Sequence, residues 1–240
     1  ITLHYYNSGR WGKYADTEQN LHIMFQAPFE QIADEKPNFD MARAKKKEVW
    51  ITEYNHYDRG RCLHDTWAHG LFLATQTLTF LEDTIITKAL CHTITTDARM
   101  GCLFNDSNGL IDFENYKNDA NCNVNAPFTR PHQKSAGGTA ISMVAKAMQN
   151  ATSKKKINFG AGTPVFLNGY QMIYGWQFDG PLGTEAIILN LDSVSHSVNF
   201  SAATWNLANG KFAQVYPGPG GPLEFIVGNP VSNPTAHELT

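Results

Sequence analysis

The segment from Val49 to Ile94 limits the fold most, because it reads as a strand, a helix and a second strand in succession. Val49–Asn55 is a β-branched and aromatic run, typical of a strand buried on both faces. Between Thr66 and Leu81, apolar residues recur every three or four positions, which predicts an amphipathic helix. Thr84–Ile94 predicts the next strand. This succession matches one βαβ unit and therefore predicts a parallel sheet.

The carboxyl-terminal third follows a different pattern, in which short apolar or alternating runs are separated by turn signals. Asn168-Gly169 and Asp179-Gly180 are examples of these signals, and they predict antiparallel hairpins. Evenly spaced short strands without intervening helices are typical of a β-sandwich. We therefore expect an α/β domain over residues 1–156 and an all-β sandwich domain over residues 157–240.

Composition excludes two classes of partner. The chain has 19 Lys+Arg and 22 Asp+Glu among 240 residues, so its charge balance indicates no surface for nucleic acid or an anionic membrane. A membrane-spanning helix needs about 20 apolar residues. The longest apolar stretch, Leu71–Leu81, is interrupted by threonines and Gln76. We expect neither a nucleic-acid partner nor a membrane span.

Cysteine and histidine spacing indicates no cofactor. The cysteines lack a CxxC pair, and their disulfide pairing stays open because four cysteines allow three connectivities; they are Cys62, Cys91, Cys102 and Cys122. The histidines that invite a metal interpretation lack HExxH or comparable spacing; they are His56, His64, His69 and His92. Glycosylation triplets beginning at Asn105, Asn150 and Asn199 favour a secreted or extracellular protein.

Glu53 is the residue that points most directly to chemistry. It ends an otherwise hydrophobic strand, and catalytic groups of parallel barrels gather at the carboxyl ends of strands. Counting alternate residues places Glu53 on one face with Val49 and Ile51, and it places His4 and Tyr6 together on the first strand. A phenol that donates to a carboxylate lowers the carboxylate's pKa, as a nucleophile requires. A solvated glutamate and a core histidine are the alternative interpretations.

Four segments carry a more specific pattern: Ile1–Asn7, Val49–Asn55, Thr66–Leu71 and Leu103–Asp106. Together they resemble the carboxyl-terminal half of retaining (β/α)8 glycoside hydrolases, closest to the α-L-arabinofuranosidase-like group, and Trp-Ile-Thr-Glu-Tyr-Asn is the most specific part. The resemblance implies barrel strands six, seven and eight at Ile1–Tyr6, Val49–Asn55 and Thr84–Ile94, followed by a β-sandwich. It also implies that Glu53 is the nucleophile and that a glutamate on strand four is the acid/base.

The acid/base glutamate that this resemblance implies would precede Ile1. Retaining hydrolysis requires two carboxyl groups about 5 to 5.5 Å apart. The nearby acids do not occupy the matching strand; they are Asp58, Asp65, Asp97, Asp106 and Glu114. The sequence also opens inside a strand, so we expect an amino-terminal half, as a separate polypeptide or a lost segment, and no activity from this chain alone.

Candidate substrate contacts follow the same two strands and their loops. They are Trp11, Tyr54, Asn55 and Tyr57. The aromatic rings offer flat apolar area to a sugar face, although ordinary packing is the alternative for each of them.

Three functions remain open at this point. The first is a retaining glycoside hydrolase in which Glu53 attacks the anomeric carbon and Tyr6 and His4 orient it. The second is a non-catalytic carbohydrate-binding or extracellular structural protein that keeps the fold. In the third, residues 157–240 bind the glycan and the barrel only presents them.

Overall fold

The computed structural model describes residues 1–7, 18–56, 67–94, 103–104, 134–194, 196–198, 211–213 and 236–238. Trp11 and Tyr57, two of the predicted substrate contacts, lie outside this part of the chain, as do three of the four cysteines. Cys91 is a free thiol. A search of the described helices finds none with the length and apolar character needed to cross a membrane.

The predicted parallel sheet is confirmed. It consists of β1 (Thr2–Asn7), β2 (Val49–His56) and β3 (Ile86–Cys91) in that order, and both neighbouring pairs are parallel. Two helical crossover connections, long enough for parallel strands, join them. Helices α1 (Glu18–Asp34) and α2 (Lys36–Ala44) lead from β1 to β2, and α3 (Trp67–Thr79) with the short 3-10 helix η1 (Phe80–Glu82) leads from β2 to β3.

The helices cover one face of this sheet, and the core lies between them. Val49 and Ile51 of β2 are fully buried there. Phe80 of η1 contacts the ring of Tyr5 from β1 and the ring of Tyr54 from β2, with ring centroids 5.6 and 5.1 Å apart. The opposite face is more open, since Trp50 is 38% exposed and the ammonium of Lys88 lies over its ring. The expectation that β2 is buried on both faces is therefore wrong within this chain.

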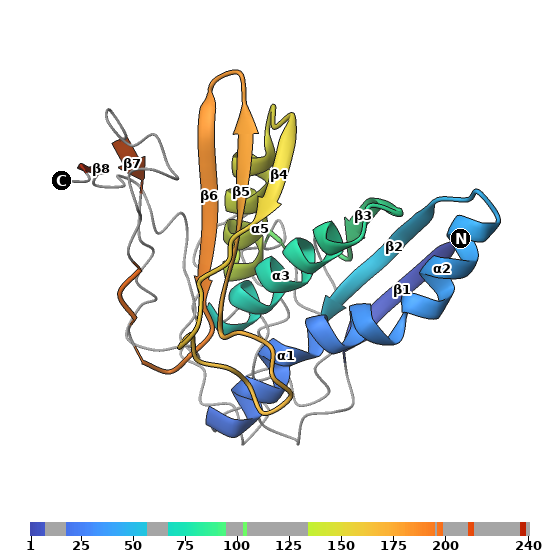
Figure 1. The fold of residues 1–240 in the computed structure, drawn as a ribbon, viewed down its shortest axis with the longest axis horizontal. Helices are drawn as coiled ribbons and strands as arrows, with labels where there is room; N and C mark the ends of the chain where they lie inside the picture. The colour runs from blue at the N-terminus through green and yellow to red at the C-terminus, as the bar shows by residue number, and fades with distance from the viewer. Residues whose placement is uncertain are drawn as a thin grey trace.

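A second, antiparallel sheet contains β4 (Ser153–Lys156), β5 (Ile173–Gly180) and β6 (Gly183–Asn190). Helix α5 (Ala136–Met148) packs beside it, and α3 lies between the two sheets (Figure 1). A short pair, β7 (Lys211–Ala213) and β8 (Ala236–Glu238), completes the described elements.

The antiparallel prediction is confirmed for these strands, but the described residues hold no second sheet stacked face to face on β4–β6 as a sandwich. Strand β4 also lies before residue 157, so the antiparallel sheet begins inside the stretch that we assigned to the α/β domain. The division of the chain into domains stays a prediction.

Candidate functional site

A β-bulge in β2 decides which way Glu53 points. Leu3 pairs with Ile51, but the next residue of β1, His4, pairs with Glu53, so Thr52 is an extra residue in β2. A bulge of this kind breaks the alternation of side chains and re-aims the residue that follows it. Glu53 thus lies on the face opposite Val49 and Ile51. Our count of alternate residues, which placed Glu53 with them, is wrong because it assumed a regular strand.

Glu53 meets the two residues of β1 that the sequence predicts. The Tyr6 hydroxyl donates a hydrogen bond to Oε2 of Glu53, and Nδ1 of His4 lies 3.6 Å from the same oxygen. The side chains of His4 and Glu53 are 54% and 37% exposed, so this group borders solvent on the open face of the sheet. Because β1 and β2 are parallel, the three residues gather toward the carboxyl ends of their strands, where parallel barrels place their active sites.

The local electrostatics keep Glu53 ionised. The hydrogen bond from Tyr6 lowers the pKa of Glu53 below its usual value, and His4 and His92 contribute in the same direction, while desolvation opposes them. No acidic side chain of the described residues is among the groups that shift this pKa. The arrangement therefore favours the ionised form of the Glu53 carboxyl group.

We expect Tyr6→Phe to raise the pKa of Glu53, because the substitution removes the donor that stabilises the ionised form. A ¹³C NMR titration of the glutamate δ-carbons, assigned with Glu53→Gln, measures the change in this chain. In the Tyr6→Phe protein, any activity that needs ionised Glu53 should therefore begin to fall at a higher pH, on the acid side of its pH profile, than in the parent protein.

Tyr5→Phe is the matched control. Tyr5 is the neighbouring tyrosine on the same strand, but it faces the helices and packs on Phe80. It should leave the titration of Glu53 unchanged. Equal titration curves for the Tyr6 variant and the parent protein would show that the phenol does not bind this carboxylate.

A network behind Glu53 fixes the ends of β2 and β3. The amide nitrogen of Asn55 donates to the carbonyl oxygen of His92 at 2.6 Å. Its amide oxygen accepts from the backbone N–H of His56 at 2.6 Å and lies 2.8 Å from Nε2 of His69 on α3. Since that oxygen can only accept, His69 carries its proton on Nε2 in this arrangement. Asn55 is fully buried and joins three elements, rather than standing open to a substrate as the sequence predicts.

Tyr54 also differs from the prediction that it stacks on a sugar. Its ring is 3% exposed, and its hydroxyl hydrogen-bonds the hydroxyl of Thr77 on α3 at 2.9 Å. Burial raises the pKa of this phenol. The bulge explains the difference, because it returns Tyr54 to the helix-covered face, so that no ring face is left for a ligand.

His92 lies beside Tyr6, although the sequence analysis considered it only as a metal ligand and not with Glu53. The predicted strand ran to Ile94, which placed His92 inside it, whereas β3 ends at Cys91. His92 therefore follows the carboxyl end of its strand, as Asn55 and His56 end theirs. Its ring meets the ring of Tyr6 edge to face, with centroids 6.2 Å apart. Adjacency to a parallel strand end is the signal that would have found it.

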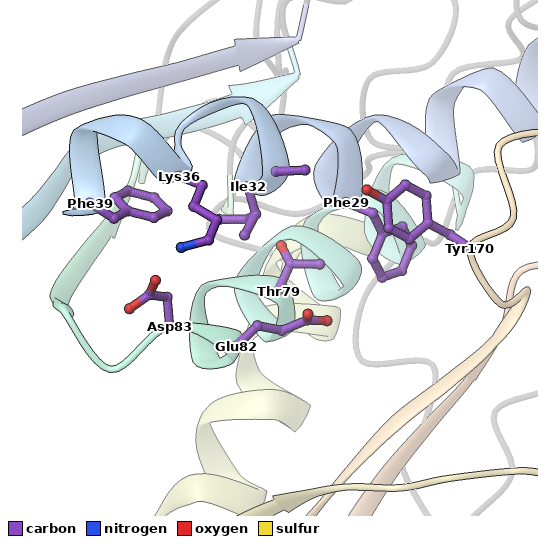
Figure 2. Close-up of a pocket in the computed structure, with 9 residues that line it drawn as sticks. Phe29, Ile32, Lys36, Phe39, Thr79, Glu82, Asp83 and Tyr170 are labelled. Atoms are coloured by element: carbon purple, nitrogen blue, oxygen red, sulfur yellow. The ribbon is translucent and has the colours of Figure 1, made fainter.

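A cavity of about 220 Å³ lies elsewhere, on the helix-covered side between α1, α2 and η1 (Figure 2). It is lined by Phe29, Ile32, Ala33, Lys36, Phe39, Thr79, Glu82, Asp83 and Tyr170. Its charged groups already have partners within the chain: Lys36 pairs with Asp40, Asp83 with Arg43, and Glu82 with Lys156. The cavity shares no residue with the Glu53 group and belongs to the packing between the helices and Tyr170.

Comparison with known proteins supports the fold. The sequence matches no protein-family model and no curated protein. Among solved structures, the GH51 arabinofuranosidase from Xanthomonas axonopodis pv. citri superposes with a TM-score of 0.51 and 12% identity over 81% of this chain and 38% of its own.

Two further structures are similar at a lower score. A 4-O-α-L-rhamnosyl-β-D-glucuronidase from Fusarium oxysporum 12S has a TM-score of 0.48 and 13% identity over 82% of this chain and 35% of its own. An α-L-arabinofuranosidase from Thermotoga maritima has a TM-score of 0.49 and 11% identity over 79% of this chain and 37% of its own. The chain thus spans little more than a third of each. The similarity to the Xanthomonas enzyme shows that the chain has a glycoside-hydrolase-like fold.

Proposed function

We propose that this chain is part of a retaining glycoside hydrolase and that Glu53 is its nucleophile. The observation that carries the proposal is the hydrogen bond from Tyr6 to Glu53, in the carboxyl-terminal halves of two parallel strands. The pair combines an ionised carboxylate, a neutral donor that orients it, and the position in a parallel sheet where enzymes of this architecture do their chemistry. The glycoside-hydrolase-like fold favours glycoside hydrolysis as the reaction of this pair.

The geometry suggests which oxygen of Glu53 attacks. Tyr6 donates a hydrogen bond to Oε2, and His4 lies next to the same oxygen, so Oε1 is the oxygen that can attack the anomeric carbon. The carboxylate forms a bond to that carbon as the bond to the leaving oxygen breaks, and an acid supplies the proton that the leaving oxygen takes. Water then attacks the same carbon and gives a proton to the group that served as the acid, so that the sugar leaves with its original configuration and the carboxylate of Glu53 is regenerated.

The acid/base residue and the remaining barrel strands are proposed to come from an amino-terminal half of the same protein. Two features support this partner. The open face of the sheet carries Trp50 and Leu90, which are 38% and 58% exposed although they lie on strands of a parallel sheet. Parallel sheets are ordinarily covered on both faces, and unpaired edges are a liability. A carbohydrate is the proposed substrate, and a secreted or extracellular location remains part of the proposal on the glycosylation triplets alone.

Trapping the covalent intermediate tests the assignment. Activated 2-deoxy-2-fluoro glycosides of arabinose and glucuronic acid are offered to the protein with all its barrel strands. Fluorine destabilises the oxocarbenium-like transition states, and the good leaving group compensates only in the first step, so the glycosyl-enzyme accumulates. Peptide mass spectrometry is expected to find the sugar on Glu53, within the segment Val49–His56.

The outcomes of the trapping experiment separate the hypotheses. A label on another carboxylate, or a label that persists in Glu53→Gln, would refute the nucleophile. A reagent that binds without labelling any carboxylate would favour the non-catalytic carbohydrate-binding alternative.

A further inference from the structure

We propose that His92 is a substrate-binding residue whose imidazole Nδ1 hydrogen-bonds a hydroxyl of the sugar that Glu53 attacks. The inference rests on the proposed function and adds a specificity contact to it. Three observations support it: hydrogen bonds hold the His92 backbone, the His92 ring contacts the ring of Tyr6, and Nδ1 of His92 is buried without a hydrogen-bond partner among the described residues.

The backbone of His92 is held on both sides. Its N–H donates to the carbonyl oxygen of Tyr54 at 3.0 Å, and its own carbonyl oxygen accepts from the buried amide of Asn55 at 2.6 Å. Asn55 in turn is held by His69 on α3. The supports therefore come from β2 directly and from α3 through Asn55. Rigid support of this kind is what an orienting side chain requires.

The ring of His92 lies beside the catalytic pair. Its centroid is 6.2 Å from that of Tyr6, and the two ring planes are nearly perpendicular at 87°. His92 also helps to lower the pKa of Glu53, which agrees with an imidazole close to the carboxylate. Lys88 lies over Trp50 on the open face, and two-residue alternation along β3 and beyond it carries His92 to that same face.

Nδ1 of His92 is buried and has no hydrogen-bond partner among the described residues. A buried polar atom without a partner is destabilising, so such atoms mark places where a ligand or water completes the bonding. A sugar hydroxyl suits this nitrogen in either tautomer, because a hydroxyl both donates and accepts. His92 as a residue is only partly buried, and its ring lies beside Tyr6, which hydrogen-bonds Glu53.

Two substitutions separate the nitrogen from the ring. His92→Asn keeps a polar atom close to the position of Nδ1, whereas His92→Phe keeps a ring and removes both nitrogens. In the protein with all its barrel strands, we expect His92→Phe to lower kcat/KM for the best hydrolysed 4-nitrophenyl glycoside by roughly ten-fold, the effect of one lost hydrogen bond. His92→Asn should recover most of that loss. His196→Asn is the control, since His196 pairs with Asp192 in the part of the chain beyond β6.

Substrate analogues identify the contact. A series of 4-nitrophenyl glycosides, each lacking one sugar hydroxyl, is compared in the parent and in His92→Phe. One deoxy substrate is expected to react equally with both proteins, because the hydroxyl that His92 binds is already missing. If His92→Phe lowers kcat/KM for every deoxy substrate by the same factor, or does not lower it for any substrate, the proposed contact is refuted.

NMR of the ring nitrogens keeps this test apart from the test of the nucleophile. Glu53→Gln removes hydrolysis but leaves the binding surface, so the ¹⁵Nδ1 signal of His92 should shift when that variant binds the unhydrolysed glycoside. A bound glycoside that leaves this signal in place refutes the His92 contact even where Glu53 proves to be the nucleophile. A shift together with full activity of Glu53→Gln would refute the nucleophile and keep the contact.

Discussion

Replacing Glu53 by alanine is expected to lower kcat/KM by about 10³-fold or more in the proposed complete barrel, because the proposed double displacement would lose its nucleophile. The expectation follows from the position of Glu53 beside Tyr6 and His4 and from its lowered pKa. Initial rates on a 4-nitrophenyl glycoside measure it. Nitrophenolate is a leaving group that needs little protonation, so the loss reports the nucleophile rather than the acid.

Azide gives the Glu53 experiment a chemical signature. With the carboxylate gone, azide can enter the vacated space and attack the anomeric carbon while nitrophenolate leaves. This single displacement yields a glycosyl azide of inverted configuration, whereas the double displacement that we propose for the parent protein would retain configuration.

Glu48→Ala is the control, because Glu48 precedes the same strand and its carboxylate accepts from Trp50 and Thr87 at the other end of the sheet. It should keep activity. A Glu53→Ala protein that hydrolyses glycosides at the parent rate, or an azide product of retained configuration, would contradict the proposed mechanism.

Gly138→Ala is expected to destabilise the protein, although glycine-to-alanine changes ordinarily favour a helix by about 1 kcal/mol. Gly138 lies in the first turn of α5, and its N–H donates to the capping hydroxyl of Ser135 at 3.0 Å. A Cβ there would overlap the carbonyl group of Leu103, whose oxygen also accepts from the N–H of Ser135. Overpacking costs about 1–3 kcal/mol, and the upper end applies here because the Cβ would meet backbone atoms rather than the end of a side chain. Subtracting the roughly 1 kcal/mol gained in helix propensity leaves an expected net loss of about 2 kcal/mol.

Thermal unfolding followed by circular dichroism tests this expectation. For a chain of this size, a loss of about 2 kcal/mol lowers Tm by roughly 4–8 °C. Ser142→Ala, in the middle of the same helix, should leave Tm unchanged or slightly raised, because it adds no atom and alanine has a higher helix propensity than serine. A higher Tm for Gly138→Ala would mean that Leu103 does not pack against this turn.

Much of the α/β part could be predicted because its signals are local. The β-branched run at Val49–Asn55 and the helical spacing after Thr66 each determine an element without knowledge of its neighbours. The parallel order followed from the length of the connections. The sandwich could not be confirmed in the same way, because stacking of two sheets depends on contacts between distant strands, and the described residues show three antiparallel strands beside helix α5.

The site was predicted less completely, for reasons of register. Tyr6 and His4 were correctly placed together because β1 is regular. The face of Glu53 depends instead on how β2 pairs with β1, and the identity of Thr52 does not indicate that a bulge forms there. The same bulge turns Tyr54 into a core residue. His92 was missed because the strand boundary was set three residues too late, at Ile94 rather than Cys91.

The extra residue at Thr52 has a consequence for changes of length in β2. It divides the strand into two stretches in which the alternation of side chains is offset by one residue. Val49 and Ile51 point toward the helices before it, and Tyr54 points toward them after it. Deleting Thr52 itself would merge the stretches and keep Glu53 outward, whereas deleting a residue inside either stretch would turn apolar side chains outward or bring the carboxylate under the helices. We therefore expect β2 to keep both its buried apolar face and the outward Glu53 only when the deleted residue is Thr52.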